Sequence, residues 1–157
     1  MSLTLLNRQR TKQIEAHRLK QIVAALFAEL AIPGAELGIT LVGAQEMARV
    51  NRQFLQHEGS TDVITFDHRE DGAGAGQIHG ELYICVDDAV KQAKEFGTHW
   101  QAELVRYIVH GVLHLLGYDD LQPARRRRMK QEENRLVRLL DRRFALAEQS
   151  PRGKMSA

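Results

Sequence analysis

The chain has 157 residues, of which 43% are hydrophobic and 27% charged, and its formal net charge at pH 7 is +2. These values are typical of a soluble globular protein, and the length favours a single domain. No apolar run approaches the roughly 20 residues that span a bilayer, and the N-terminal segment lacks a signal-peptide pattern. Cys85 is the only cysteine, which excludes an internal disulfide. We therefore expect a cytoplasmic protein with no membrane segment.

Hydrophobic periodicity predicts the elements of the first half of the chain. They are strands at 2–7, 37–42 and 62–66 and helices at 19–30 and 44–54. Thr11 is a candidate cap for the first helix, and Pro33 ends its pattern. In the second helix we expect Met47, Val50 and Phe54 to point inward.

The second half begins with a polar, glycine-rich segment at 67–77. Its glycines resemble a nucleotide-binding loop, but no helix opens after them, so we expect a mobile hairpin loop. The elements predicted next are a strand at 78–86 and helices at 89–96, 101–116 and 123–146. Acidic residues before the first of these helices, and Thr98 before the second, are candidate caps.

The order β-α-β-α-β-β-α-α-α predicts an α+β fold. We expect one domain over residues 1–147, with a mixed sheet of about four strands covered by about five helices. The apolar helix at 101–116 is expected to be central. Residues 148–157 have nothing to bury and are expected to form a disordered tail.

Positive charge is concentrated near the C-terminus. Residues 122–157 contain 11 Lys and Arg against 4 Asp and Glu, whereas residues 1–121 contain 11 against 16. The run from Arg125 to Arg128 could contact phosphate groups. A charge run on a terminal helix is also typical of a solvated face, and the two interpretations are compatible.

A candidate metal site lies at the end of the central helix. His110 and His114 are four residues apart, so both imidazoles lie on one face, one turn apart. Gly117 favours a left-handed helix end that turns the chain back, which brings Asp120 within reach as a third ligand. Two imidazoles and one carboxylate suit Zn²⁺ and leave one position open for water.

A histidine pair at this spacing is more often a coincidence than a metal site. Here apolar residues surround most of the helix, and two buried imidazoles need polar partners, which a metal would supply. Glu103 and Tyr107 share the face of the histidines and are candidates to orient an imidazole. Gly111 stands where an H-E-x-x-H metalloprotease has its glutamate, which disfavours peptide hydrolysis.

The run H-G-V-L-H-L-L-G-Y-D-D at 110–120 resembles the H-G-x-L-H-L-x-G-Y-D-H signature of the YbeY family of bacterial metal-dependent endoribonucleases. Asp120 stands where that signature has its third histidine. The segments T-D-V-I-T-F at 61–66 and G-E-L-Y-I-C at 80–85 resemble the family's T-D-V-L-S-F and G-E-I-Y-I-S.

The resemblance implies a zinc-dependent endoribonuclease specific for single-stranded RNA. It further implies maturation of the 3′ end of small-subunit rRNA, a role in ribosome quality control, and the ribosomal small subunit as a partner. We expect a monomer. His110, His114 and Asp120 would be the ligands of one Zn²⁺ per chain.

A second position departs from the family pattern, because Leu55 occupies the place of an arginine implicated in activity. Arg52 and His57 are candidates to supply a phosphate donor instead, and an exposed loop histidine is the alternative for His57. Leu55 also favours a second hypothesis, a metal-stabilised ribosome-assembly factor that binds RNA with little hydrolysis. A metalloprotease is a third.

Overall fold

The computed structural model describes residues 2–55, 61–70 and 77–148. The strands are β1 (Ser2–Asn7), β2 (Ala35–Val42), β3 (Val63–Asp67) and β4 (Ile78–Cys85). The helices are α1 (Ala16–Glu29), α2 (Ala44–Val50), α3 (Val86–Phe96), α4 (Trp100–Leu115) and α5 (Pro123–Phe144). A π-helical turn, η1 (Asn51–Leu55), follows α2, and a 3₁₀ turn, η2 (Leu146–Glu148), follows α5. The predicted α+β class and order of elements are confirmed.

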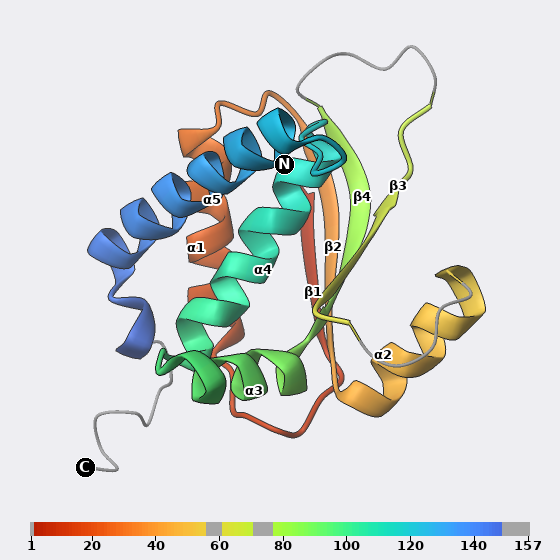
Figure 1. The fold of residues 1–157 in the computed structure, drawn as a ribbon, viewed down its shortest axis with the longest axis vertical. Helices are drawn as coiled ribbons and strands as arrows, with labels where there is room; N and C mark the ends of the chain where they lie inside the picture. Colours follow the sequence, from red (N-terminus) through yellow and green to blue (C-terminus); the bar gives the residue numbers. More distant parts are fainter. Residues whose placement is uncertain (1, 56–60, 71–76, 149–157) are drawn as a thin grey trace.

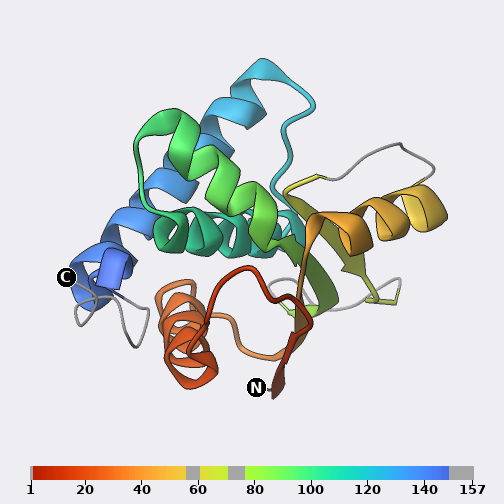
Figure 2. The same ribbon diagram turned by 90° about the horizontal axis from the view of Figure 1, so that it is seen from below.

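The four strands form one mixed sheet in the order β1-β2-β4-β3. β1, β2 and β4 run parallel, and β3 pairs antiparallel with β4. Helices α1, α4 and α5 lie on one side of the sheet and α2 on the other (Figure 1, Figure 2). In the described ranges, no helix combines the length and the apolarity needed to cross a membrane.

The main core lies between the sheet and the three helices on its first face. Alternate residues of β2 and β4 point into it, because successive strand side chains face opposite ways. Those strand residues are Leu37, Ile39, Leu41, Ile78, Leu82 and Ile84. Leu104, Ile108 and Val112 cover them from α4 and are also fully buried. The prediction that this helix is central is therefore confirmed.

Two glycines allow α4 to lie close to the sheet. A Cβ atom on Gly111 of α4 would lie 2.7 Å from Leu82 Cδ2. A Cβ atom on Gly80 of β4 would lie 2.6 Å from the carbonyl oxygen of Phe66 and 3.0 Å from Leu115 Cδ2. A larger residue at Gly80 would displace the backbone of β3, and one at Gly111 would have to displace the buried side chain of Leu82.

The second face of the sheet is covered only in part. Met47 and Val50 of α2 pack there against a small cluster that includes Ile64 and Cys85. Phe54, predicted to point inward, is instead 58% exposed, and its ring packs edge to face with that of Phe66. The change from α-helix to π-helix at Asn51 shifts the helical phase and carries Phe54 off the inward stripe.

The predicted caps were wrong, because the helices begin at other residues. α1 begins at Ala16, so the residue that precedes it is Glu15 and not Thr11. The Thr11 hydroxyl instead donates a hydrogen bond to the carboxylate of Asp87. The residue before α4 is His99, not Thr98. The acidic residues predicted to precede α3 lie within its first turn, where they still suit the helix dipole.

Two other predictions fall on residues outside the described ranges. They are the mobile loop, whose positions 71–76 are not described, and the disordered tail, of which only Glu148 is described.

We expect Gly80→Ala to lower the free energy of unfolding by about 1–3 kcal/mol, because the added methyl group overlaps the backbone of β3. Urea unfolding followed by circular dichroism measures the change. Gly34→Ala is the matched control, because a Cβ atom there has no heavy atom within 4 Å. Equal losses in the two variants would contradict the packing described above.

Candidate active site

The last turns of α4 bring His110 and His114 together. Their rings meet edge to face, with centroids 4.7 Å apart. The helix then ends at Gly117, whose φ of 106° belongs to the left-handed region that favours glycine. Gly117 N donates to His114 O, and Tyr118 N donates to Leu113 O, so the chain turns back beside the histidines. The predicted helix end is confirmed.

Glu133 of α5 fixes the orientation of His110. One carboxylate oxygen, Oε1, lies 2.7 Å from His110 Nδ1, and the other accepts hydrogen bonds from Arg106 and Lys130. Burial alone would raise the pKa of Glu133, but the hydrogen bonds from His110 and Arg106, with the charge of Lys130, lower it to about 2. The carboxylate is therefore ionised and accepts a hydrogen bond from His110 Nδ1, and in the neutral imidazole this tautomer leaves the lone pair on Nε2.

This role for Glu133 was missed at the sequence level, where Glu103 and Tyr107 were the candidates. Neither of them makes a hydrogen bond to a histidine in the described part of the chain. A signal for Glu133 is nevertheless present in the sequence. It lies on the buried stripe of α5 between Met129 and Leu136, where an unpaired carboxylate would be costly.

His114 is half-buried beside His110. Burial lowers the pKa of His114, repulsion from His110 when that ring is protonated acts in the same direction, and the negative charge of Asp120 opposes the shift. A lowered pKa favours the neutral imidazole at physiological pH, which is the form that binds a metal. Both histidines are thus disposed to present ring nitrogens as ligands.

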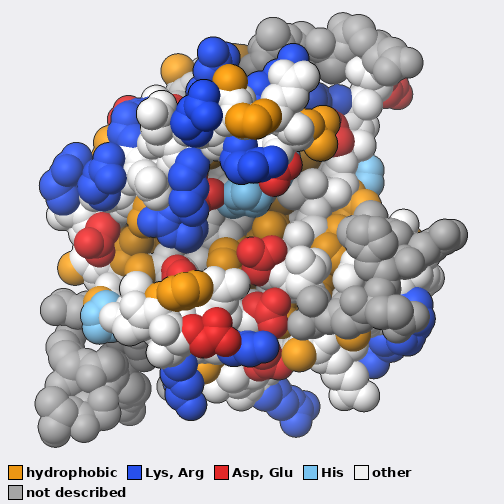
Figure 3. Space-filling model, viewed as in Figure 1, with side chains coloured by type: hydrophobic (Ala, Val, Ile, Leu, Met, Phe, Trp, Pro, Cys, Tyr) orange, Lys and Arg blue, Asp and Glu red, His pale blue; other side chains and the backbone are white. Residues whose placement is uncertain are grey.

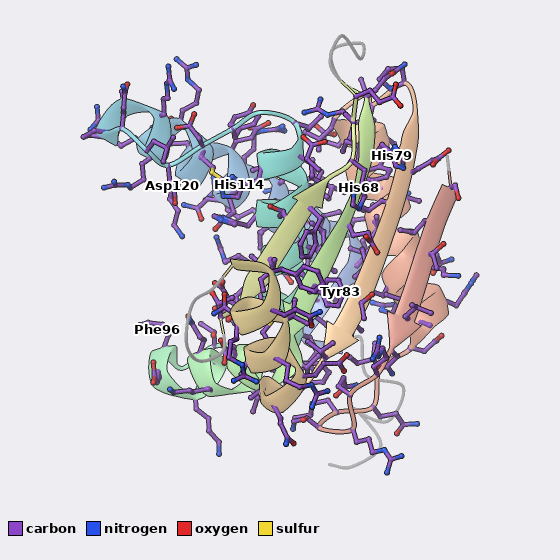
Figure 4. The ribbon with its side chains drawn as sticks, turned by 90° about the vertical axis from the view of Figure 1, so that its right-hand side faces the viewer. His68, His79, Tyr83, Phe96, His114 and Asp120 are labelled. Atoms are coloured by element: carbon purple, nitrogen blue, oxygen red, sulfur yellow. The ribbon has the colours of Figure 1, made fainter. Side chains whose placement is uncertain are left out.

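Asp120 lies near His114 at the same end of the molecule (Figure 4). Its carboxylate is exposed, and its backbone carbonyl accepts hydrogen bonds from Arg126. Among the described residues, no group of three His, Cys, Asp or Glu side chains is close enough to hold a metal ion as it stands. The structure therefore brings the two histidines together, and the role of Asp120 as third ligand stays a prediction.

A groove of about 800 Å³ opens beside His110 and Asp120. Its floor comes from α4, with Glu103, Tyr107 and His110, and one wall comes from α5, with Arg126 and Lys130. Figure 3 shows a hollow with histidine at its edge, Lys and Arg side chains along one side and Asp and Glu side chains along the other. The site is thus at one end of an open, electrically polarised groove.

The structure explains why Gly111 cannot be replaced by the glutamate of a metalloprotease. Gly111 faces the sheet, and its Cβ position is blocked by Leu82. A side chain at this point of α4 would enter the core instead of the groove. The geometry therefore disfavours the metalloprotease hypothesis more strongly than the sequence alone.

Arg52, one of the two candidates for a phosphate donor, does not line the groove. Arg52 is exposed on η1, which follows α2 on the opposite side of the sheet (Figure 1). His57 and the side chain of Leu55 lie outside the residues that the structure describes. Three described cations line the groove: Arg126 and Lys130 from the basic C-terminal segment, and Arg106 of α4, which is paired with Glu133.

The fold is also found in a protein from Thermotoga maritima whose structure was determined in solution. The two chains superpose with a TM-score of 0.69 over 94% of each chain, at 23% sequence identity. This likeness supports the architecture described above.

Sequence comparison is more specific. The model of the family described as "Endoribonuclease YbeY" matches residues 4–141. A protein of that name from Chlorobium phaeovibrioides is 36% identical over 140 residues, which cover 89% of this chain and 91% of that protein. Another from Geobacter metallireducens is 32% identical over 146 residues, or 90% and 97% of the two chains. The chain therefore belongs to the YbeY family of endoribonucleases.

Proposed function

We propose that this protein is a zinc-dependent endoribonuclease that cleaves single-stranded RNA, with His110, His114 and Asp120 as the zinc ligands. The observation that carries the proposal is the contact between Glu133 and His110 Nδ1. A carboxylate that accepts from the far nitrogen of an imidazole is the usual support of a metal-binding histidine, because it fixes the tautomer and the ring orientation.

The donor set fits zinc. Two imidazoles and one carboxylate are ordinary zinc ligands and leave one coordination position open, as in hydrolytic sites. Zinc there supplies a Lewis acid and lowers the pKa of a bound water to about 7. The protein itself contributes orientation through Glu133, and Arg126 and Lys130 draw phosphate groups to this end of the groove.

The biological assignment follows the family. We propose that the substrate is ribosomal RNA, cleaved during maturation of the 3′ end of small-subunit rRNA and in ribosome quality control. The ribosomal small subunit would then be the partner, and the cytoplasm the location. The basic wall of the groove is compatible with such a substrate.

A second function is favoured by Leu55, which replaces the family's arginine. In that case the protein is a ribosome-assembly factor that binds RNA, and the metal stabilises its fold. RNA binding that survives chelation, without cleavage products at stoichiometric protein, would support this function over the enzyme. Digestion of casein at the same zinc concentration would instead support the disfavoured metalloprotease.

We expect His114→Ala to remove bound zinc and to lower the rate of cleavage of unpaired RNA by about a hundredfold or more, because one of the three protein ligands is lost. Elemental analysis of the purified protein and a gel assay with an unstructured RNA measure the two effects. His17→Ala is the control, because His17 is an exposed histidine on α1. Loss of zinc with undiminished cleavage would overturn the proposed mechanism.

We expect Glu133→Gln to weaken zinc binding by about 10- to 100-fold, because the neutral amide holds His110 less firmly in its metal-binding tautomer. Competition with a chromophoric chelator measures the dissociation constant. Glu132→Gln provides the control, because Glu132 is the adjacent carboxylate and pairs with Arg135 at the surface. Similar zinc affinity in both variants would show that Glu133 serves only the packing of α5.

A further inference from the structure

The groove beside the histidines extends along α4 to the end of α3. His110 and Asp120 lie at one end, and Phe96 and Thr98 line the other. Figure 4 shows Phe96 on the same side of the molecule as His114 and Asp120, but well apart from them. From Ala102 to His110, the first and last residues of α4 that line the groove, the helix rises by about 12 Å, at about 1.5 Å per residue. The groove is therefore long enough for more than the reacting group.

Phe96 is unusual among the residues that line this groove, because it is a large apolar side chain that is 67% exposed. It is the last residue of α3, and Gly97 ends that helix in the left-handed conformation, with a φ of 65°. Thr98 N then donates to Ala93 O, which closes the helix end. The aromatic ring is thus presented to solvent from a well-defined turn and is not part of the core.

Charged side chains of both signs line the groove. Arg126 and Lys130 lie one turn apart on α5, and the carboxylate of Glu133, on the same helix, is paired with Arg106 and Lys130. Asp62 and Glu103, which belong to other elements, line the groove as well and would repel a phosphate group. A nucleic acid strand therefore fits in one orientation, with its phosphates along α5 and its bases turned toward Phe96. In that orientation the carboxylates can accept hydrogen bonds from base amino groups.

The floor offers one further polar group. The Tyr107 hydroxyl is buried and has no hydrogen-bond partner among the described residues. Burial raises the pKa of Tyr107, and nearby carboxylates, Asp62 first among them, add to the shift. The hydroxyl therefore stays protonated and keeps a hydrogen bond to donate, from the turn of α4 that precedes His110.

We propose that Phe96 is a stacking platform for an unpaired base of single-stranded RNA, while Arg126 and Lys130 hold the phosphates that lead from this base to the histidines. The proposal rests on the proposed function in that the ligand is RNA. The stacking of a base on Phe96 would also explain the proposed preference of the protein for single-stranded RNA over duplex RNA. A base within a duplex is already stacked and paired, so it cannot lie on Phe96.

The test measures binding without cleavage. Fluorescence anisotropy follows a short labelled RNA strand of unstructured sequence, and the same strand annealed to its complement, both in the presence of EDTA. We expect Phe96→Ala to weaken binding of the single strand by about 5- to 100-fold and to leave duplex binding unchanged. Phe96→Trp should retain the affinity. Leu6→Ala, which removes another exposed apolar side chain, on β1, is the control.

A second binding experiment tests the proposed contacts of Arg126 and Lys130 with phosphate groups. The double variant Arg126→Ala/Lys130→Ala should weaken binding of single strand and duplex alike. It should also reduce the slope of log affinity against log salt concentration by about 1.4 for the single strand, the value for two lost contacts. Arg127→Ala/Arg138→Ala removes equal charge from exposed positions of α5 and should leave the slope unchanged.

Three results would overturn the proposal: unchanged single-strand affinity in Phe96→Ala, an equal loss on the duplex, or no binding by the unsubstituted chain. Binding that depends on Phe96 without cleavage in zinc would support the platform and overturn the enzymatic function. Where cleavage occurs, we expect Phe96→Ala to raise KM and leave kcat unchanged, because the residue lies away from the histidines.

Discussion

The buried carboxylate of Glu133 is the interaction on which the site depends. It is almost fully buried, so it stays ionised only because cations and donors surround it. Arg106 and His110 approach from α4, whereas Lys130 approaches from its own helix. The same ion-pair network therefore packs α5 onto α4 and fixes the imidazole that faces the groove, so stability and function depend on one group.

A second constraint is the close approach of α4 to the sheet at Gly80 and Gly111. This close approach determines which side of α4 can contribute side chains to the groove, because the residue after His110 faces Leu82 in the core. A general base next to the first histidine is therefore sterically excluded. Under the proposed function, another residue of the groove or solvent would assist proton transfer, and this separates the proposed site from metalloproteases that use the glutamate of H-E-x-x-H.

Local patterns in the sequence were sufficient for much of this structure. The histidine pair, the left-handed end at Gly117 and the alternation in β2 depend on residues a few positions apart, so helix and strand geometry predict them. The contact of His110 with Glu133 spans 23 residues and depends on how two helices pack, which periodicity does not specify. Phe54 was misplaced for a related reason, because a π-helical turn changes the phase without an evident sequence signal.

The arginine run shows how packing divides a charge cluster that looks uniform in the sequence. Successive residues of a helix point about 100° apart, so the buried stripe of α5 sets the direction of each arginine. Arg126 turns to the groove, whereas Arg125 pairs with Asp119 and, with Arg128, lines a separate hollow beside Gly117. Arg127 and Arg138 remain exposed. The solvated face and the face that borders the groove are thus two sides of one helix, so the two interpretations of the run stay compatible.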